Sequence, residues 1–307
     1  MSTVKLLLGG LMLGDTFHII PYLNRLLREG VTKIYWVTGT YEQAAVEFLQ
    51  HFYPIEATFL PDGSPADLSA RYKFSRNAGA QFIDIDADVS ITNVEASLCS
   101  GSFEPDRSLY ILNNIELLDS PEEDSIILHP QTVHDWKKVP GISDADWQSL
   151  GKTCYTVGHS NEFLIPNTID FRGKSFFEVA QKIRSCKLVV GIHSAIACLT
   201  LHLDKPMLVC HPWKDAPPSA FLYFGYFKES MKDIINPPGP QLLELARKAL
   251  IGEYVESEPL EEPRSLSPLD QREVVEVESG SDLKKIGGVT VEACCLSDLK
   301  EIFSEEI

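Results

Sequence analysis

The sequence predicts an α/β protein with two parallel-sheet domains and an acidic C-terminal extension. Three observations favour this fold class. Apolar runs of strand length alternate with amphipathic helical segments, the alternation starts afresh near residue 125, and the composition changes after residue 252. Strands that alternate with helices indicate parallel sheets with right-handed crossovers. A chain of 307 residues is long enough for two such domains.

The first domain is predicted over residues 1–120. A strand at 4–10 is followed by a glycine turn and a helix at 14–30, in which apolar residues recur at the spacing of one helix face. A second strand at 33–39 precedes a helix at 41–52. The remaining expected elements are a strand at 57–60, a helix at 66–79 and strands at 81–86, 90–94 and 108–114.

The second domain is predicted over residues 121–252, after a polar, proline-containing linker at 117–125. It repeats the alternation of the first domain, so a second parallel sheet is expected. Its strands are expected at 125–130, 153–158, 187–191 and 206–212, and its helices at 143–150, 175–186, 194–203 and 242–252.

Residues 253–307 are predicted to form an acidic linker and a small C-terminal extension, because Glu, Pro and Ser dominate their first half. This stretch carries a net charge of −10 out of −17 for the whole chain. The charge disfavours nucleic acid as a partner, since the sequence shows no basic patch to offset it.

Cysteine use and the N-terminus indicate a cytoplasmic protein. The seven cysteines form no C-x-x-C pair and several lie in apolar runs, which is typical of reduced core thiols. The first apolar run is too short for a signal peptide or a membrane span, so no transmembrane segment is expected there. The cysteines are Cys99, Cys154, Cys186, Cys198, Cys210, Cys294 and Cys295.

The loop after the first strand is the first candidate site. Gly9, Gly10 and Gly14 allow a tight turn and leave backbone N–H groups open at a helix N-terminus, where anions bind. Asp15 follows at the sheet edge where open α/β sheets hold their ligands. An ordinary βα turn in which Asp15 only caps the helix is about equally consistent with this pattern.

A second candidate site follows the strand at 187–191. His193, Ser194 and Ala195 form a turn into a helix, and the free N–H groups there favour an anion. The alternative is a plain helix N-cap at Ser194 with His193 on the surface.

Two further loops supply polar side chains at the same sheet edge. His129, Lys137 and Lys138 follow the first strand of the second domain and are suited to phosphate groups, and Trp136 is suited to stacking on a base. The alternative for the lysine pair is a solvated surface.

The last of these loops follows the strand at 153–158 and offers His159, Ser160 and Glu162. No H-x-x-H or H-E-x-x-H spacing accompanies its histidine, so no metal site is predicted.

At these residues the chain resembles the ADP-heptose:lipopolysaccharide heptosyltransferase family of glycosyltransferases. Residues 5–27 are similar to the family's opening strand, glycine-containing loop, Gly-Asp pair and Pro-containing helix. Residues 169–209 are similar to its C-terminal signature, with D-x-x-G-K, a helix, L-V-V-G and a serine turn before K-P. The resemblance covers about residues 4–212 in pattern and leaves the acidic extension outside.

The resemblance implies a GT-B fold, in which two Rossmann-like domains face each other across a cleft. It also implies an inverting transfer from a nucleotide-sugar donor to a hydroxyl acceptor such as a glycan or a lipopolysaccharide, without a metal or other cofactor. Asp15 matches the family's catalytic base, and Ser194 matches the residue that holds the donor diphosphate. His129 and the two lysines after it fall in the family's H-P-G loop, where this chain has Gln131 in place of glycine.

The family's D-[ST]-G-x-x-H segment reads H-S-A-I-A-C in this chain, from His193 to Cys198. This departure leaves two alternatives open. One is a glycosyltransferase that acts on a modified DNA base, as some viral GT-B enzymes do. The other is a catalytically inactive GT-B-like protein that binds a nucleotide or a partner. A dinucleotide-dependent oxidoreductase is disfavoured, because no G-x-G-x-x-G follows the first strand.

Overall fold

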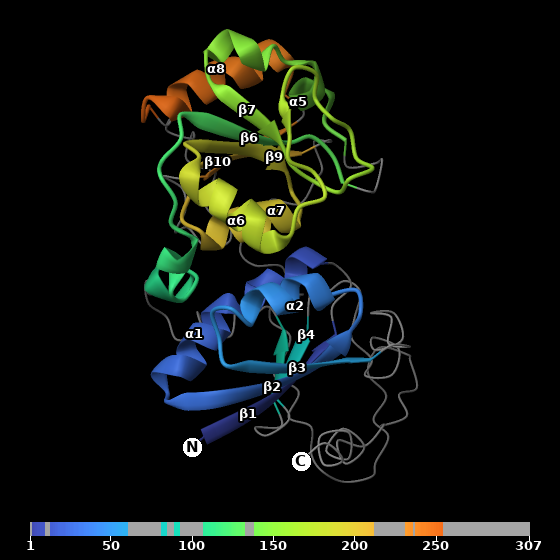
Figure 1. The fold of residues 1–307 in the computed structure, drawn as a ribbon, viewed down its shortest axis with the longest axis vertical. Coiled ribbons are helices and arrows are strands. Elements are labelled where there is room, and N and C mark those ends of the chain that lie inside the picture. The colour runs from blue at the N-terminus through green and yellow to red at the C-terminus, as the bar shows by residue number, and fades with distance from the viewer. Residues whose placement is uncertain are drawn as a thin grey trace, which may run out of the picture. The chain divides into compact units, whose positions relative to one another are not determined.

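A computed structural model describes residues 2–9, 13–60, 81–84, 89–92, 107–132, 138–211, 231–235 and 237–253 (Figure 1). The chain divides into two compact units. The described residues up to 92 belong to the first unit, and those from 107 onward belong to the second. The helix predicted at 66–79 and the acidic extension after residue 253 lie outside the described residues.

The first unit is built on a five-stranded mixed sheet in the order β3-β2-β1-β4-β5. The first three strands are parallel to one another, as predicted. Strand β4 pairs antiparallel with β1, and β5 pairs antiparallel with β4. The strands are β1 (Ser2–Gly9), β2 (Val31–Gly39), β3 (Ile55–Leu60), β4 (Gln81–Asp84) and β5 (Val89–Thr92).

The antiparallel pair departs from the all-parallel sheet that the sequence predicts, and the reason is the connection length. Strand β4 ends at Asp84 and β5 begins at Val89. A parallel crossover needs about a dozen residues or more, whereas antiparallel neighbours are joined by short turns. Four intervening residues therefore require the two strands to run in opposite directions.

Helices α1 (Ile20–Arg28) and α2 (Gln43–Leu49) cover one face of this sheet (Figure 1). The helix predicted from residue 14 begins as a 3-10 helix, η1 (Leu13–Ile19), and continues as α1. The predicted apolar face is confirmed, because Ile20, Leu23 and Leu26 are buried. Phe17 of η1 and Phe48 of α2 meet edge to face, with ring centroids 5.9 Å apart.

The second unit is a six-stranded sheet in which all neighbouring strands are parallel. Its strand order is β11-β10-β9-β6-β7-β8, which is the 3-2-1-4-5-6 order of a doubly wound fold. The order reverses between β6 and β9, so these two strands form the topological switch point. The strands are β6 (Ser125–His129), β7 (Thr153–Thr156), β8 (Ile169–Asp170), β9 (Leu188–Ile192), β10 (Met207–His211) and β11 (Met231–Ile235).

Helices cover both faces of the second sheet. Helices α6 (Phe176–Ser185) and α7 (Ala195–His202) lie on one face, and α5 (Pro140–Asp144) and α8 (Gly239–Leu250) lie on the other (Figure 1). Strands β6, β9 and β10 are consequently buried along their whole length, as expected for a parallel sheet between two helical layers. Helix α6 begins with a capping box in which Ser175 and Glu178 exchange hydrogen bonds.

The segment predicted as a linker at 117–125 is held to the second unit by ion pairs. Arg184 lies 2.7 Å from Asp119, and Lys182 lies 2.7 Å from Glu123. The Lys182 bond is also the first cause of the lowered pKa of Glu123. Because both basic residues lie on α6, the segment is held against that helix as part of the second unit.

Two expected elements take a different form. The helix predicted at 143–150 is split into α5 and a 3-10 helix, η5 (Trp147–Leu150), because Ala145 is extended. The strand predicted at 108–114 is a 3-10 helix, η2 (Arg107–Leu109), followed by turns. The two edge strands β8 and β11 were not predicted. None of the described helices is long and apolar enough to cross a membrane.

Candidate functional site

Three of the predicted loops of the second unit meet at the switch point of its sheet. His129 is the last residue of β6, and Ser194 follows β9, the neighbouring strand. Glu162 lies in the loop after β7, which is the neighbour of β6 on its other side. In doubly wound sheets, ligands bind outside the carboxyl ends of the strands at this point. The three side chains therefore occupy the expected place for a ligand site.

His129 is the centre of the cluster. It is 3% exposed and ends the buried run of β6. Gly191 of β9 is its cross-strand partner. A Cβ atom at Gly191 would lie 3.0 Å from Cβ of His129, which is tighter than ordinary contacts. Glycine at position 191 thus leaves space for the backbone and Cβ of His129 beside β9.

Ser194 occupies the N-cap position of α7, but its hydroxyl is directed at the histidine. The Ser194 Oγ lies 3.0 Å from Nδ1 of His129. Within the described residues of α7, no backbone N–H donates a cap hydrogen bond to this side chain. The N–H groups of the first helical turn have no partner inside a helix and carry the positive end of its dipole. The start of α7 is therefore suited to an anion.

Glu162 lies on the other side of the imidazole. Its Oε2 is 3.4 Å from Nε2 of His129 and accepts a hydrogen bond of 3.0 Å from the backbone N–H of His159. The residue is 8% exposed. Gly158, with φ of +138°, makes this position accessible, since a Cβ atom there would lie only 2.0 Å from Oε2 of Glu162.

Arg172 holds the backbone of the same residue from the segment after β8. Its guanidinium donates to the backbone carbonyl of Glu162 and forms a bidentate pair with Asp170. The pKa of Arg172 is raised, first by its hydrogen bond with Asp170 and last by the charge of Glu162. The pair also lowers the pKa of Asp170 to about 2. Glu162 thus contacts two basic side chains, His129 through its carboxylate and Arg172 through its backbone carbonyl.

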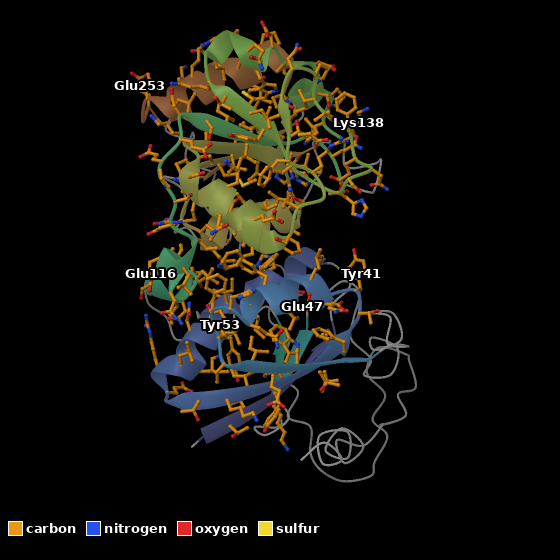
Figure 2. All side chains as sticks on the ribbon, viewed as in Figure 1. Tyr41, Glu47, Tyr53, Glu116, Lys138 and Glu253 are labelled. Carbon is orange, nitrogen blue, oxygen red and sulfur yellow. The ribbon has the colours of Figure 1, made fainter. Side chains whose placement is uncertain are left out.

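The remaining residues predicted for this site lie around the cluster at the surface. Lys138, on the segment before α5, is exposed and its Nζ lies 5.5 Å from the centre of the Phe163 ring (Figure 2). His159 and Ser160 are exposed, and Nδ1 of His159 lies 2.7 Å from Oδ1 of Asn161. Lys137 lies outside the described residues.

A second histidine pair lies at the same edge of the sheet. His193, immediately before Ser194, is half-buried, and its ring centroid is 6.1 Å from that of His211. His211 is buried at the end of β10 and was not predicted as a site residue. The sequence did contain a signal, because His-Pro ends both β6 and β10. Ala195 is the first residue of α7, at the predicted turn.

The candidate site of the first unit is described in part. Gly9 ends β1, and Gly14 and Asp15 lie in η1, where Gly14 is buried. Gly10 and the side chain of Asp15 lie outside the described positions.

A buried carboxylate that was not predicted lies near the end of β2. The hydroxyl of Thr38 donates to Oε2 of Glu42 over 3.4 Å, and both residues are buried. In the parts of the chain that the structure describes, no group of three or more His, Cys, Asp or Glu side chains is placed to hold a metal ion.

Comparison with known proteins gives a likeness of fold. No family model and no curated protein matches the chain. Among solved structures, Escherichia coli heptosyltransferase WaaC with ADP matches with a TM-score of 0.50 and 15% identity, over 81% of this chain and 100% of that chain. The same enzyme with ADP-2-deoxy-2-fluoro heptose matches with a TM-score of 0.50 and 13% identity, over 81% and 98%.

A third structure, E. coli ADP-heptose lps heptosyltransferase II, matches with a TM-score of 0.50 and 14% identity, over 82% of this chain and 99% of that chain. The resemblance to heptosyltransferases is therefore confirmed at the level of the fold, and the chain has a GT-B-like α/β fold. Identities this low show the fold and not the reaction.

Proposed function

We propose that this protein is a glycosyltransferase whose second unit binds a nucleotide-sugar donor. The observation that carries the proposal is the contact between Ser194 and His129 at the switch point, beside the N-terminus of α7. A hydroxyl, a buried imidazole and free helix N–H groups at one sheet edge form a site for a phosphate group. The solved structures of similar fold are described with ADP and an ADP-sugar analogue, so ADP-sugars are the first donors to test.

In this proposal the diphosphate lies against the start of α7. Ser194 and the backbone N–H of Ala195 contact phosphate oxygens, and Lys137 and Lys138 add positive charge from the loop after β6. His193 and the exposed His159 and Ser160 lie beside the donor. These groups balance the charge of the leaving nucleoside diphosphate, which is how a transfer without a metal ion proceeds.

In the transfer step, the general base that we propose is Asp15. The acceptor hydroxyl attacks the anomeric carbon of the sugar, and the bond from that carbon to the diphosphate oxygen breaks. The electron pair leaves with the nucleoside diphosphate, and Asp15 takes the hydroxyl proton. A single displacement of this kind inverts the anomeric configuration. The acceptor class we propose is a glycan or lipopolysaccharide hydroxyl.

The test is the release of nucleoside diphosphate from nucleotide sugars, with and without glycan acceptors. We expect the Asp15→Asn variant to lose about 10²–10⁴-fold in turnover, because general-base catalysis contributes that much, while it binds the donor as the wild type does. Full activity in Asp15→Asn would remove this residue from the mechanism. Donor binding with no turnover in the wild type would instead favour the inactive nucleotide-binding protein.

A further inference from the structure

We propose that binding of the donor diphosphate takes up one proton, and that His129 is the residue that holds it. The inference rests on the proposed function, since it concerns the same site. It follows from the chain of contacts that runs from Glu162 through both ring nitrogens of His129 to the Ser194 hydroxyl. Both ring nitrogens thereby face a partner, so the protonation state of the ring fixes the direction of the hydrogen bond with Ser194 and the charge that faces Glu162.

A neutral His129 has one favourable tautomer. With the hydrogen on Nε2, the ring faces the Glu162 carboxylate with an N–H, and Nδ1 accepts the proton of Ser194. With the hydrogen on Nδ1, the lone pair of Nε2 would face the carboxylate oxygen at 3.4 Å, which is repulsive. In the favoured tautomer, the single hydroxyl proton of Ser194 is directed at the ring. Only oxygen lone pairs then face the ligand side, and these repel a phosphate.

A protonated His129 reverses the contact with Ser194. Both ring nitrogens then carry a hydrogen: the N–H of Nε2 faces the Glu162 carboxylate, and that of Nδ1 donates to the Ser194 oxygen. The hydroxyl proton becomes available to donate to a phosphate oxygen, and the ring adds one positive charge behind it. An anion at Ser194 therefore stabilises the protonated ring, and the protonated ring stabilises the bound anion. This reciprocity is the linkage between proton and ligand.

Other charged or titratable groups lie around His129 and bear on which group takes up the proton. From the loop after β7, the Glu162 carboxylate lies against Nε2 of the ring, and Arg172 binds the backbone carbonyl of Glu162. From β9 and β10, the ring pair of His193 and His211 adds two more titratable groups at this edge. Each of these is a second candidate for the proton, so the experiment must assign it to His129.

The protonated ring also serves the transfer step. The nucleoside diphosphate gains a negative charge on the oxygen that leaves the sugar, and the positive charge of His129 reaches it through the Ser194 hydroxyl. No proton is transferred by His129, and the acceptor proton still goes to Asp15. His129 is therefore a positioning residue that sets the direction of the Ser194 hydroxyl.

The experiment is calorimetric binding of ADP, GDP, UDP, CDP and dTDP, each measured at about pH 8 in two buffers of different ionisation enthalpy. Imidazoles are mostly neutral at this pH, and a phosphate with a second pKa near 6 is already ionised. For the wild type we expect an uptake of about one proton per ligand, and an affinity that falls by up to about tenfold per pH unit as pH rises.

Two variants of His129 test whether this residue takes up the proton. The His129→Gln and His129→Asn variants are expected to bind without proton uptake and with a flat pH profile, since an amide does not titrate. The His129→Asn amide lies closest to the former Nδ1 position and can donate to Ser194, so this variant is expected to bind more tightly than His129→Gln. The exposed histidine of the first unit provides the control, and His51→Gln is expected to keep the wild-type uptake.

The outcomes separate the two proposals. Binding with no proton uptake in the wild type, or with the same uptake in both His129 variants, overturns this inference and leaves the proposed function intact. Absence of binding with all five nucleoside diphosphates overturns both. Uptake in the wild type and in His51→Gln, lost in both His129 variants, supports the inference.

Discussion

The Ser194 hydroxyl lies 3.0 Å from Nδ1 of His129, although 65 residues separate the two in the sequence. The contact exists because β6 and β9 are neighbours in the sheet and end at the same edge. It joins two loops that the sequence indicated separately and with weak specificity. Glu162 extends the contact to a third loop, so three weak sequence signals become one site.

A glycine-to-alanine pair tests whether the position of Glu162 matters. In Gly158→Ala, the new Cβ atom would lie 2.0 Å from Oε2 of Glu162, so the carboxylate must shift from its position beside His129. A displacement of about 1 Å in a catalytic site costs about 10²-fold in rate. We expect a loss of this size in turnover, together with a lowered melting temperature.

Gly151→Ala is the matched control. Gly151 also has a positive φ, of +63°, but a Cβ atom there meets nothing within 4 Å. The variant is expected to lose about 1–2 kcal/mol of stability from backbone strain and to keep wild-type turnover. Equal turnover in the two variants, both shown to be folded by circular dichroism, would contradict the role given to Glu162.

Acid should destabilise the second unit through His202. Burial lowers the pKa of this histidine to about 4, against a usual value of 6.5, and a hydrogen bond to the Tyr110 carbonyl only partly offsets the effect. The unfolded chain therefore binds a proton at pH values where the folded chain does not. Stability from this residue is complete above about pH 6.5 and falls as pH drops towards 4, by up to about 1.4 kcal/mol per pH unit.

Urea unfolding between pH 7 and pH 4.5 measures this slope. We expect His202→Asn to be less stable at pH 7, because the ring packing is lost, and to show a slope smaller by about one proton equivalent. The exposed His159 serves as the control, and His159→Gln is expected to keep the wild-type slope. An unchanged slope in His202→Asn would show that another group is responsible.

Four of the seven cysteines should resist modification in the folded protein. Burial raises the pKa of Cys154 to about 11 and that of Cys186 to about 12, and Cys198 and Cys210 are buried as well. A thiol must ionise to react. At about pH 8 we expect at most three thiols to react quickly with a disulfide reagent, and seven after unfolding. Fast reaction of a fourth thiol in native protein would contradict the buried positions.

Much of the fold could be predicted because the apolar composition of the strands indicates which segments are buried. The runs that form β6, β9 and β10 are apolar on both faces, and a chain that alternates such runs with helices has few arrangements other than a doubly wound sheet. The thiols of Cys154, Cys186, Cys198 and Cys210 are buried, so the prediction of core thiols is confirmed for these four.

The failures of prediction share a cause, which is that short elements depend on contacts distant in the sequence. Strand β8 has two residues and takes its strand geometry from pairing with β7. The run from Ser108 to Asn114 is apolar enough for a strand, yet the backbone N–H of Leu112 bonds the carbonyl of His202 on α7 instead. No local pattern could show either partner.

The sequence predicts which loops carry the site residues, but it does not predict which of these residues touch one another. The positions of His129, Ser194 and Glu162 follow from strand ends, but which of them touch depends on the strand order. Gly158 and Gly191 were missed for a related reason, since a glycine needed for close approach looks like any turn or strand glycine until its neighbours are known.

The most direct test of the account is a thermal-shift screen of the wild type and Ser194→Ala against ADP-, GDP-, UDP-, CDP- and dTDP-sugars. A ligand at 100 times its Kd stabilises a protein by about 2.7 kcal/mol. We expect one nucleotide family to raise the melting temperature of the wild type by several degrees. The Ser194→Ala variant, folded as judged by its own melting curve, is expected to lose most of that rise. No shift with any of the five, or an equal shift in Ser194→Ala, would contradict a donor site at the switch point of the second unit.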